Sequence, residues 1–507
     1  MTETDPLANT RTIVYNNLGL PVSETDKNGV TSQYSYDALL RIASISKGSE
    51  EVSYSYDLAG NLTQMQDNEG TTNYTYDYCG NQLSQSRGGT ILSYTYDDIG
   101  NCITMSSSAN NGASTQSATY RYSIKGNLTQ AEHGLFKGVY VYDDNGNIKR
   151  STVYYSTSSV NIEMYTYNVG NLPIKRTRGG QTTNIYYNLD GSISRINGGG
   201  ENSEFVYDKA GRLITEEKDG ETTTYTYDKR GNRLSKTNAD ESITYVYDLN
   251  NRLISSTKVT GDSTETTTYT YDANGNLIQK QSPNESITYS YNPMGTLASV
   301  ANNTTQTTAY YTYDGNGLRQ SKRVVTAPDN EVTTQFVNDR GNVIEEITDG
   351  VSTKYSRGRR ILGVQDGTTY AYYLYNMHGD VESVIRKTNS YVLDKYDYDA
   401  FGNCSAEYAR MNSPFRYCGE YYDDESGLIY LRNRYYDPSK GRFITEDSAK
   451  DGLNWYVYCG NDPVNRIDPT GESWKDTVYG LAQAIDQNNY GGFIEKLSDK
   501  ISGDLII

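Results

Sequence analysis

A short motif recurs along most of this chain, and its spacing restricts the fold more than any other feature of the sequence. The motif reads Tyr-x-Tyr-Asp-x-x-Gly-Asn with departures, and in four consecutive copies its aspartate recurs every 20 residues, at Asp37, Asp57, Asp77 and Asp97. Eighteen copies are in register, mostly 20 to 26 residues apart, and the residues at their Asp position are Asn16, Asp37, Asp57, Asp77, Asp97, Ser123, Asp143, Asn168, Asn188, Asp208, Asp228, Asp248, Asp272, Asn292, Asp314, Asn338, Asn376 and Asp399. This periodicity indicates a repeat architecture in which each copy is one supersecondary unit.

Each copy predicts a β-hairpin. The two tyrosines stand at positions i and i+2 and therefore project from one face of a strand. The following Asp-x-x-Gly-Asn, as in Asp272–Asn276, matches a type I turn with Asp at its first position and Gly in the left-handed place that follows. A polar stretch then turns the chain back toward the next motif. One repeat thus predicts two antiparallel strands, and the 18 copies predict about 36 strands.

So many strands cannot form one flat open sheet, because twisted sheets rarely exceed about 10 strands without curling or closing. A propeller would need a super-period of about 40 residues with alternating copies, whereas consecutive copies here are equivalent. The predicted fold is therefore all-β: a spiral of antiparallel β-hairpins that forms a hollow shell, or cocoon.

Tyrosine dominates the apolar composition, with 51 copies in 507 residues against 7 Phe and 2 Trp. A mean hydropathy of −0.73 and a net charge of −17 would suit a disordered chain, but an aromatic content of 12% does not. In a hairpin wall the tyrosine ring packs on cross-strand neighbours while its hydroxyl can face water or a polar lumen. The composition therefore favours a wetted wall over a solid core.

Several classes of protein are excluded or disfavoured. The sequence contains no run of about 18 apolar residues, so no membrane span is expected, and a pI near 4.7 without a basic stripe argues against a nucleic acid partner. The five cysteines form no CxxC pair, and the two histidines, His133 and His378, lie far apart in the sequence. We therefore expect no disulfide framework, no metal site and no cofactor.

The first residues contain no basic segment followed by an apolar stretch, so a secretory signal is not expected in this chain. We interpret the chain as the C-terminal part of a longer polypeptide that is secreted or displayed at the cell surface.

The motifs of residues 11–403 resemble the YD repeats of the Rhs (rearrangement-hotspot) family and its relatives, which include bacterial wall-associated proteins, teneurins and the C component of insecticidal toxin complexes. The segments Tyr396–Asn403, Pro414–Asp447 and Asn454–Gly471 resemble the Rhs repeat-associated core that closes such chains. The resemblance implies a β-shell that encloses a C-terminal toxic effector until delivery to a competing bacterium or a host cell. An immunity protein is a further implied partner.

This resemblance divides the chain into three parts: a YD-repeat shell at 1–395, an Rhs repeat-associated core at 396–471, and a variable C-terminal tail at 472–507. The apolar residues of the tail recur near helical spacing, which predicts a short α-helical segment. Thirty-six residues without His or Cys are too few for an effector enzyme. The tail is therefore a truncated or degenerate effector region or, equally, a cap on the core.

The only enzymatic activity that the resemblance implies is self-cleavage near residue 472, which uses one aspartate from each of two DPxGL-like segments. The matching residues here are Asp447 and Asp468, 21 positions apart, although Ser448 replaces the proline and Glu472 the leucine of that pattern. The chemistry needs both carboxylates in a poorly solvated pocket, where one stays protonated while the other activates water. In the alternative interpretation, Asp468 begins a tight turn and Asp447 caps a strand end.

Three other functions fit the sequence less well. A tyrosine-rich wall would suit a cell-surface carbohydrate-binding or adhesion protein, with a cell-surface glycan as partner. Calcium-binding repeats are disfavoured because each turn offers one carboxylate, whereas calcium needs six to eight oxygens. A hydrolase using Asp423, Asp424 and Glu425 is disfavoured because adjacent strand residues point to alternate faces.

Overall fold

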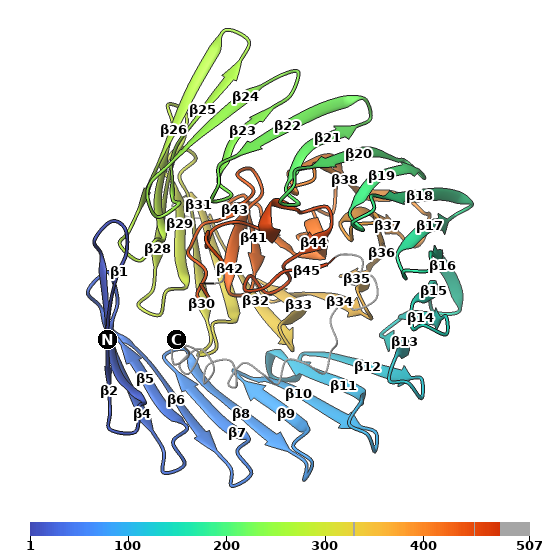
Figure 1. The fold of residues 1–507 in the computed structure, drawn as a ribbon. Coiled ribbons are helices and arrows are strands. Elements are labelled where there is room, and N and C mark those ends of the chain that lie inside the picture. Colours follow the sequence, from blue (N-terminus) through green and yellow to red (C-terminus); the bar gives the residue numbers. More distant parts are fainter. Residues whose placement is uncertain (328–329, 451, 477–507) are drawn as a thin grey trace.

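The computed structural model describes residues 1–327, 330–450 and 452–476. Its main element is one antiparallel sheet of 39 strands in which every strand pairs with the next along the chain. We call this sheet the wall (Figure 1). The residues after it form a four-stranded sheet, β40–β43, and a two-stranded sheet, β44–β45, and we call residues 410–476 the inner block.

The strands have the following bounds. Those of the wall up to residue 247 are β1 (Thr2–Thr4), β2 (Thr10–Tyr15), β3 (Pro21–Thr25), β4 (Thr31–Tyr36), β5 (Ile42–Lys47), β6 (Glu50–Tyr56), β7 (Leu62–Asp67), β8 (Gly70–Tyr76), β9 (Gln82–Arg87), β10 (Thr90–Tyr96), β11 (Cys102–Ala109), β12 (Ser114–Tyr122), β13 (Leu128–His133), β14 (Phe136–Tyr142), β15 (Ile148–Tyr155), β16 (Ser158–Tyr167), β17 (Pro173–Arg178), β18 (Gln181–Tyr187), β19 (Ile193–Gly198), β20 (Glu201–Tyr207), β21 (Leu213–Lys218), β22 (Glu221–Tyr227), β23 (Arg233–Thr237) and β24 (Ser242–Tyr247). The rest of the wall comprises β25 (Leu253–Thr260), β26 (Ser263–Tyr271), β27 (Leu277–Gln281), β28 (Ser286–Tyr291), β29 (Leu297–Asn302), β30 (Thr307–Tyr313), β31 (Arg319–Ala327), β32 (Asn330–Asp339), β33 (Asn342–Thr348), β34 (Val351–Arg357), β35 (Ile361–Asp366), β36 (Thr369–Tyr375), β37 (Val381–Arg386), β38 (Val392–Tyr398) and β39 (Cys404–Ala409). The inner block contains β40 (Tyr421–Asp423), β41 (Leu428–Leu431), β42 (Arg434–Asp437), β43 (Arg442–Phe443), β44 (Arg466–Ile467) and β45 (Lys475–Asp476), and the short 3₁₀ turns are η1 (Asn110–Gly112), η2 (Tyr417–Gly419) and η3 (Cys459–Asn461).

The turn after each motif has the predicted chemistry. In one copy the Oδ1 atom of Asp57 accepts the Asn61 amide (2.8 Å), and its Oδ2 atom accepts the Asn61 side chain (2.9 Å). Gly60 has a φ of +97° and donates its amide to the Asp57 carbonyl (3.2 Å), as a left-handed position after a type I turn requires. The copy at Asn338 differs, because Asn338 stays within β32 and the chain turns two residues later.

A β-bulge recurs at the second tyrosine of the motif and explains why the sheet coils. The strand register shifts there in the pairs that contain Tyr15, Tyr36, Tyr56, Tyr76, Tyr96, Tyr122, Tyr142, Tyr167, Tyr187, Tyr207, Tyr227, Tyr247, Tyr271, Tyr291, Tyr313 and Tyr375. A bulge bends its strand and increases the local twist. Repeating it once per hairpin curves the whole wall in one direction.

The two tyrosines of the motif have different roles. The first tyrosine of the motif is buried in many copies. These residues are Tyr54, Tyr94, Tyr120, Tyr140, Tyr165, Tyr225, Tyr245, Tyr269, Tyr289, Tyr311, Tyr373 and Tyr396. The second donates its hydroxyl to the backbone carbonyl 14 residues earlier, at 2.6–3.0 Å, in Tyr56, Tyr96, Tyr142, Tyr187, Tyr207, Tyr227, Tyr247, Tyr291 and Tyr375 of the described chain. We expected these hydroxyls to face water or a polar lumen, but in these copies each one bonds the backbone of an earlier strand.

Replacing Tyr227 by Phe should lower the free energy of unfolding by about 0.5–1.5 kcal/mol, the usual net value of one internal hydrogen bond. The substitution keeps the ring but leaves the Leu213 carbonyl without the 2.8 Å bond from the Tyr227 hydroxyl. Tyr186→Phe is the matched control, because the Tyr186 side chain is half exposed. Loss of its hydroxyl should change the free energy of unfolding by less than about 0.5 kcal/mol. Urea unfolding followed by tyrosine fluorescence measures the stability of both variants. Equal losses of stability would contradict a structural role for the hydroxyl–carbonyl bonds of the second tyrosine.

The wall coils through more than one circuit, so that early strands and turns contact later ones that are far away in the sequence. Such side-chain and backbone contacts join Asp26 to Asn274, His133 to Arg357, and Lys236 to Asp399, at separations of 248, 224 and 163 residues. The falling separation means that one circuit of the wall becomes shorter toward the C-terminal end. The predicted all-β spiral shell is thereby confirmed, and Figure 1 shows its strands curving around the inner block.

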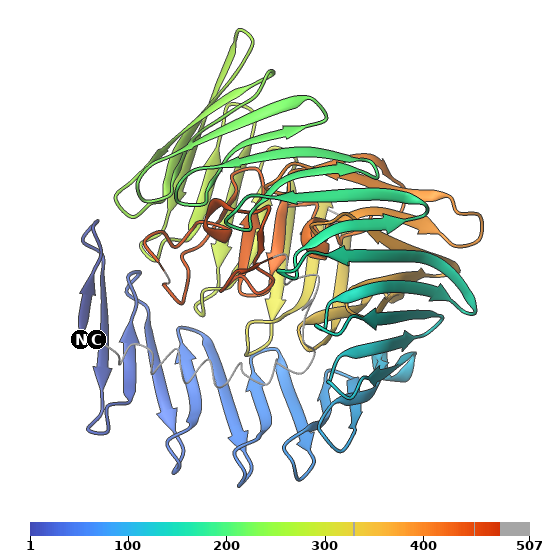
Figure 2. The same cartoon turned by 45° about the vertical axis from the view of Figure 1, so that its right-hand side comes forward.

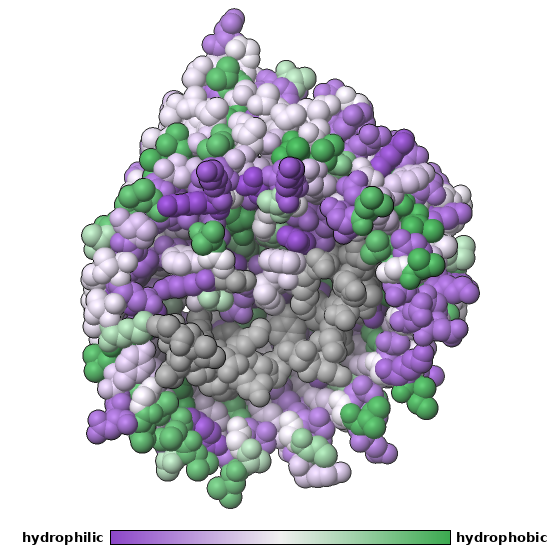
Figure 3. All heavy atoms as spheres, viewed as in Figure 1, coloured by the Kyte–Doolittle hydropathy of each residue, from purple (hydrophilic) through white to green (hydrophobic). Residues whose placement is uncertain are grey.

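The inner block lies on the concave side of the wall, as Figures 1 and 2 both show. Its rings and those of the wall form one apolar cluster, which includes Tyr245, Tyr269, Tyr289 and Tyr311 from the wall and Tyr430, Tyr436, Phe443 and Tyr458 from the inner block. This part of the shell is therefore filled by a packed core rather than by water. On the face drawn in Figure 3, hydrophobic side chains are scattered rather than gathered in one patch.

Two sequence expectations concern the ends of these elements. The sheet continues beyond the predicted boundary at residue 395, because β38 and β39 form one more hairpin that ends at Ala409. Most of the predicted helical tail, from residue 477 onward, lies outside the described residues. Among the described residues, no helix has the length and apolar character needed to cross a membrane.

Candidate self-cleavage site

The structure brings Asp447 and Asp468 together around one arginine. The Nη2 atom of Arg434, at the start of β42, lies 3.6 Å from an Oδ2 atom of each carboxylate. The two carboxylate oxygens are therefore separated by no more than twice that distance. The side chains of Arg434, Asp447 and Asp468 are 7%, 8% and 4% exposed, so the group is shielded from water, as the proposed chemistry requires.

Arg434 is held in place by contacts on several sides. Its Nε atom donates a hydrogen bond to the carbonyl of Gly471, and its Nη1 atom donates to the carbonyl of Trp455 (3.0 Å). The guanidinium carbon lies 3.6 Å from the centre of the Phe443 ring, a cation–π distance. Arg434 thus contacts both aspartates and the backbone just before residue 472.

The electrostatic environment differs from that of two isolated carboxyls. Burial raises the pKa of Asp468, while the Arg434 guanidinium and the amides of Gly471 and Thr470 oppose this rise. The nearby Asp447 carboxylate raises the pKa of Asp468 further. One guanidinium therefore faces two acids, an arrangement that favours one ionised and one protonated carboxyl.

The alternative interpretation also has support in the local geometry. Asp468 Oδ1 accepts the amides of Gly471 (2.8 Å) and Thr470 (3.3 Å), which closes the tight turn. Asp447 Oδ1 accepts the amide of Ala449 (2.9 Å) and begins a turn of its own. These bonds orient the carboxylates toward Arg434, so the turn geometry and the acid pair coexist.

Gly471 is a position where only glycine fits. Its φ is +72°, and a Cβ atom would lie 2.8 Å from the Leu431 carbonyl oxygen and 2.9 Å from the Arg434 amide nitrogen. The backbone of residue 471 is therefore pressed against the turn between β41 and β42. This close approach places its carbonyl within reach of Arg434.

The two departures from the family pattern lie beside this group. Glu472 is close enough to Arg434 to contribute to its electrostatic environment together with Asp447 and Asp468. A third carboxylate therefore competes for the same guanidinium. No contact in the described residues explains how Ser448, in place of the proline, affects this group.

The acidic run at Asp423, Asp424 and Glu425 is occupied by ion pairs. Asp423 pairs with Arg319 at 2.6 Å, Asp424 with an arginine at 2.8 Å, and Glu425 with a lysine at 3.2 Å. The first and third of these pairs join the inner block to β31 of the wall, the second lies within the inner block, and the three carboxylates do not form a hydrolytic pair. Sequence reasoning missed Arg434, whose only signal was its place inside the core-like segment Pro414–Asp447.

Comparisons with known proteins agree with this architecture. The family model described as the teneurin YD-shell matches residues 84–236 and 201–464. Among curated relatives, the tRNA3(Ser)-specific nuclease WapA of Bacillus spizizenii is 37% identical over 177 residues, which cover 32% of this chain and 7% of that protein. The double-stranded DNA deaminase toxin A of Burkholderia cenocepacia is 46% identical over 65 residues, which cover 12% of this chain and 4% of the toxin.

The chain thus spans only a small part of the length of these relatives. Among solved structures, the crystal structure of TcdB2-TccC3-TEV aligns with 92% of this chain and 31% of its own length, at 16% identity and a TM-score of 0.46. The family model matches both the repeats of the wall and the inner block, over more than half of the sequence. The chain therefore belongs to the teneurin YD-shell family, and so to the Rhs/YD-repeat proteins.

Proposed function

We propose that this chain is the C-terminal part of an encapsulating shell that carries an Rhs-type toxic effector in competition between bacteria or against a host cell. The curved wall with the inner block on its concave side supports this role, because a hairpin sheet that coils around part of the chain has the form of an enclosing shell. Curated relatives described as tRNA nucleases and a DNA deaminase toxin support it as well. The polypeptide would act outside the cell, with an immunity protein protecting the producer.

We propose further that Asp447, Asp468 and Arg434 cut the chain near residue 472. The observation that carries this proposal is the bond from Arg434 Nε to the Gly471 carbonyl, with both carboxylates on the same guanidinium. In this scheme Arg434 polarises the carbonyl, the ionised Asp447 accepts a proton from the attacking water, and the protonated Asp468 gives its proton to the leaving nitrogen. Water is consumed, and a new carboxyl and a new amino terminus are formed.

Incubation of the purified chain, followed by gel electrophoresis and intact-mass measurement, tests the scheme. We expect a fragment ending at residue 471, because Arg434 bonds the Gly471 carbonyl; a cut after position 472, where the family pattern places it, would show that Arg434 does not polarise the scissile carbonyl. Asp468→Asn should slow cleavage at least about 100-fold. Asp437→Asn is the matched control, since Asp437 only closes its own turn with Ser439. A wild-type chain that keeps its full mass would contradict self-cleavage.

Glu472→Leu provides a second variant in the same experiment. It removes the third carboxylate near Arg434 and restores the leucine of the family pattern. We expect faster cleavage than in the wild type.

No contact in the described residues favours the carbohydrate-binding alternative. Most of the motif tyrosines that would stack on sugars are instead buried or bonded to backbone carbonyls. A glycan array that gives signals above background would support that alternative.

A further inference from the structure

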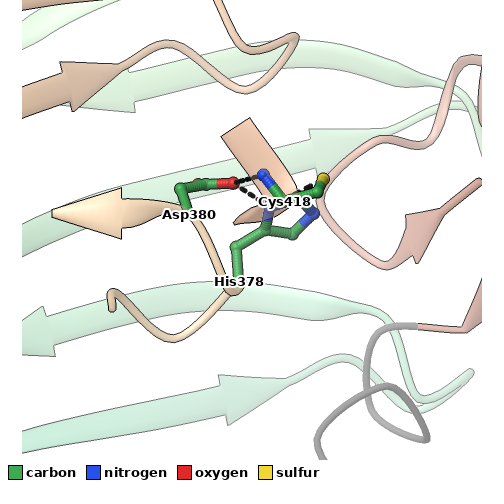
Figure 4. A group of neighbouring side chains, drawn as sticks. All are labelled: His378, Asp380 and Cys418. Carbon is green, nitrogen blue, oxygen red and sulfur yellow. Dashed lines mark hydrogen bonds and ion pairs between the residues drawn. The ribbon is translucent and has the colours of Figure 1, made fainter. Parts of the chain in front are cut away.

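A second group of polar side chains lies about the turn between β36 and β37, away from the aspartate pair. His378 and Asp380 come from this turn, and Cys418 comes from η2 of the inner block. Their nitrogen, oxygen and sulfur atoms all lie within 4.8 Å of one another. Figure 4 shows the imidazole of His378 between the carboxylate of Asp380 and the thiol of Cys418.

The distances within this group fit a metal ion after small adjustments. The Nδ1 atom of His378 lies 2.9 Å from Asp380 Oδ1 and 3.9 Å from Cys418 Sγ. Bond lengths of about 2.0–2.3 Å in tetrahedral zinc sites place neighbouring donor atoms about 3.4–3.6 Å apart. Shifts of about half an ångström would therefore convert the present contacts into a coordination shell.

A further observation concerns the other nitrogen of the imidazole. His378 Nε2 is buried, and within the described residues it has no hydrogen-bond partner. A buried polar atom without a partner is costly, and a metal ion held by Nδ1 would leave Nε2 unchanged. Nδ1 is the nitrogen that faces both Asp380 Oδ1 and Cys418 Sγ.

The cluster also has an entry path for a cation. His378 and Asp380 line a cavity of about 550 Å³ between the two circuits of the wall. Eight carboxylates line this cavity against two lysines. Five of them pair with lysine or arginine, and the charge that the other three add to the lining raises the local concentration of cations.

We propose that His378, Asp380 and Cys418 bind one Zn²⁺ ion whose fourth coordination position faces the cavity. Nitrogen and thiolate donors select zinc over calcium or magnesium, which prefer oxygen alone. On binding, the Cys418 thiol and the His378 Nδ1–H that faces Asp380 each give a proton to solvent, and Nδ1 then coordinates through its lone pair. The ion would join the wall, through the β36–β37 turn, to the inner block.

The competing explanations are a plain His378–Asp380 ion pair and a cysteine nucleophile with a histidine base. A nucleophile–base–orienter chain needs different ring nitrogens for the thiol and the carboxylate. Here the same Nδ1 atom faces both. The geometry therefore favours coordination over nucleophilic catalysis.

Titration of the purified chain with Co²⁺, which substitutes for zinc and reports thiolate ligation by its charge-transfer absorption, tests the proposal. We expect saturation at one equivalent, loss of the thiolate band in Cys418→Ser, and an affinity at least about tenfold weaker in Asp380→Asn. Cys404→Ser is the matched control, because Cys404 is not one of the three proposed ligands and its sulfur bonds the neighbouring Ser405 carbonyl, and it should keep the band. A wild-type chain without the band, or a Cys418→Ser chain that retains it, would overturn the proposal.

A measurement on the wild type alone covers the case in which Cys418→Ser does not fold. One equivalent of Zn²⁺ should reduce iodoacetamide labelling of Cys418, mapped by peptide mass spectrometry, and leave the exposed Cys79 unchanged. Equal labelling of Cys418 with and without zinc would overturn the proposal. The same equivalent should raise the thermal midpoint of the wild type.

Discussion

Arg319→Ala should lower the free energy of unfolding by about 3–5 kcal/mol, because it leaves a buried carboxylate without its main partner. The Nη1 atom of Arg319 lies 2.6 Å from Asp423 Oδ2, and the two side chains are 1% and 0% exposed. The guanidinium also lies over the rings of Phe336, Tyr421 and Tyr430. Arg319 begins β31 of the wall and Asp423 ends β40 of the inner block, so the pair fastens one to the other.

A double variant distinguishes the loss of the ion pair from the loss of side-chain packing. Arg319→Met with Asp423→Leu removes both charges and keeps apolar volume, so it should cost less than Arg319→Ala. Urea unfolding by circular dichroism, with linear extrapolation of the transition, measures all three chains. A loss below about 1 kcal/mol in Arg319→Ala would show that Lys322, which lies 3.2 Å from Asp423, compensates the carboxylate by itself.

Arg434→Met should abolish self-cleavage and also destabilise the inner block by about 3–5 kcal/mol. Without the guanidinium, Asp447 and Asp468 remain buried beside each other with no cation at 3.6 Å. At least one of them would then have to bind a proton or draw water into the site. Proteolytic susceptibility near residue 471 measures the loss of structure, and intact mass measures the loss of cleavage.

Arg434→Lys distinguishes the structural role of this residue from its role in cleavage. Lysine keeps the positive charge but cannot bond the Gly471 and Trp455 carbonyls together with both carboxylates, because it lacks the planar fork. We expect stability within about 1–2 kcal/mol of the wild type and cleavage about 100-fold slower, the usual cost of losing an oxyanion donor. Cleavage at the wild-type rate would show that charge alone is sufficient.

The sequence predicted those parts of the fold that depend on local chemistry. The Asp-x-x-Gly-Asn turn follows from the acceptor capacity of Asp57 and the freedom of Gly60 to take a positive φ, and both act within five residues. The estimate of about 36 strands is close to the 39 strands of the wall. The coiling of the wall was also predicted from the number of strands, because sheets of that size do not stay flat and open.

The remaining features depend on contacts that no local pattern encodes. The hydroxyl of Tyr227 bonds a carbonyl 14 residues earlier, which a single repeat does not reveal. His378 and Cys418 are 40 residues apart, and the sequence alone gave no reason to expect them to meet. Arg434 was overlooked because the resemblance named only the aspartates, whereas the fold places the cation between them.

The shortening circuit of the wall has a consequence for how such a gene can change in length. In the described wall each strand pairs with its sequence neighbours, and at Asp26 and Asn274 two circuits meet through turns that share the same Asp or Asn chemistry. Gain or loss of one whole repeat therefore preserves strand direction and presents an equivalent turn to the adjoining circuit. Loss of a single strand would reverse the direction of everything that follows, so recombination can lengthen or shorten this wall only in units of a complete hairpin.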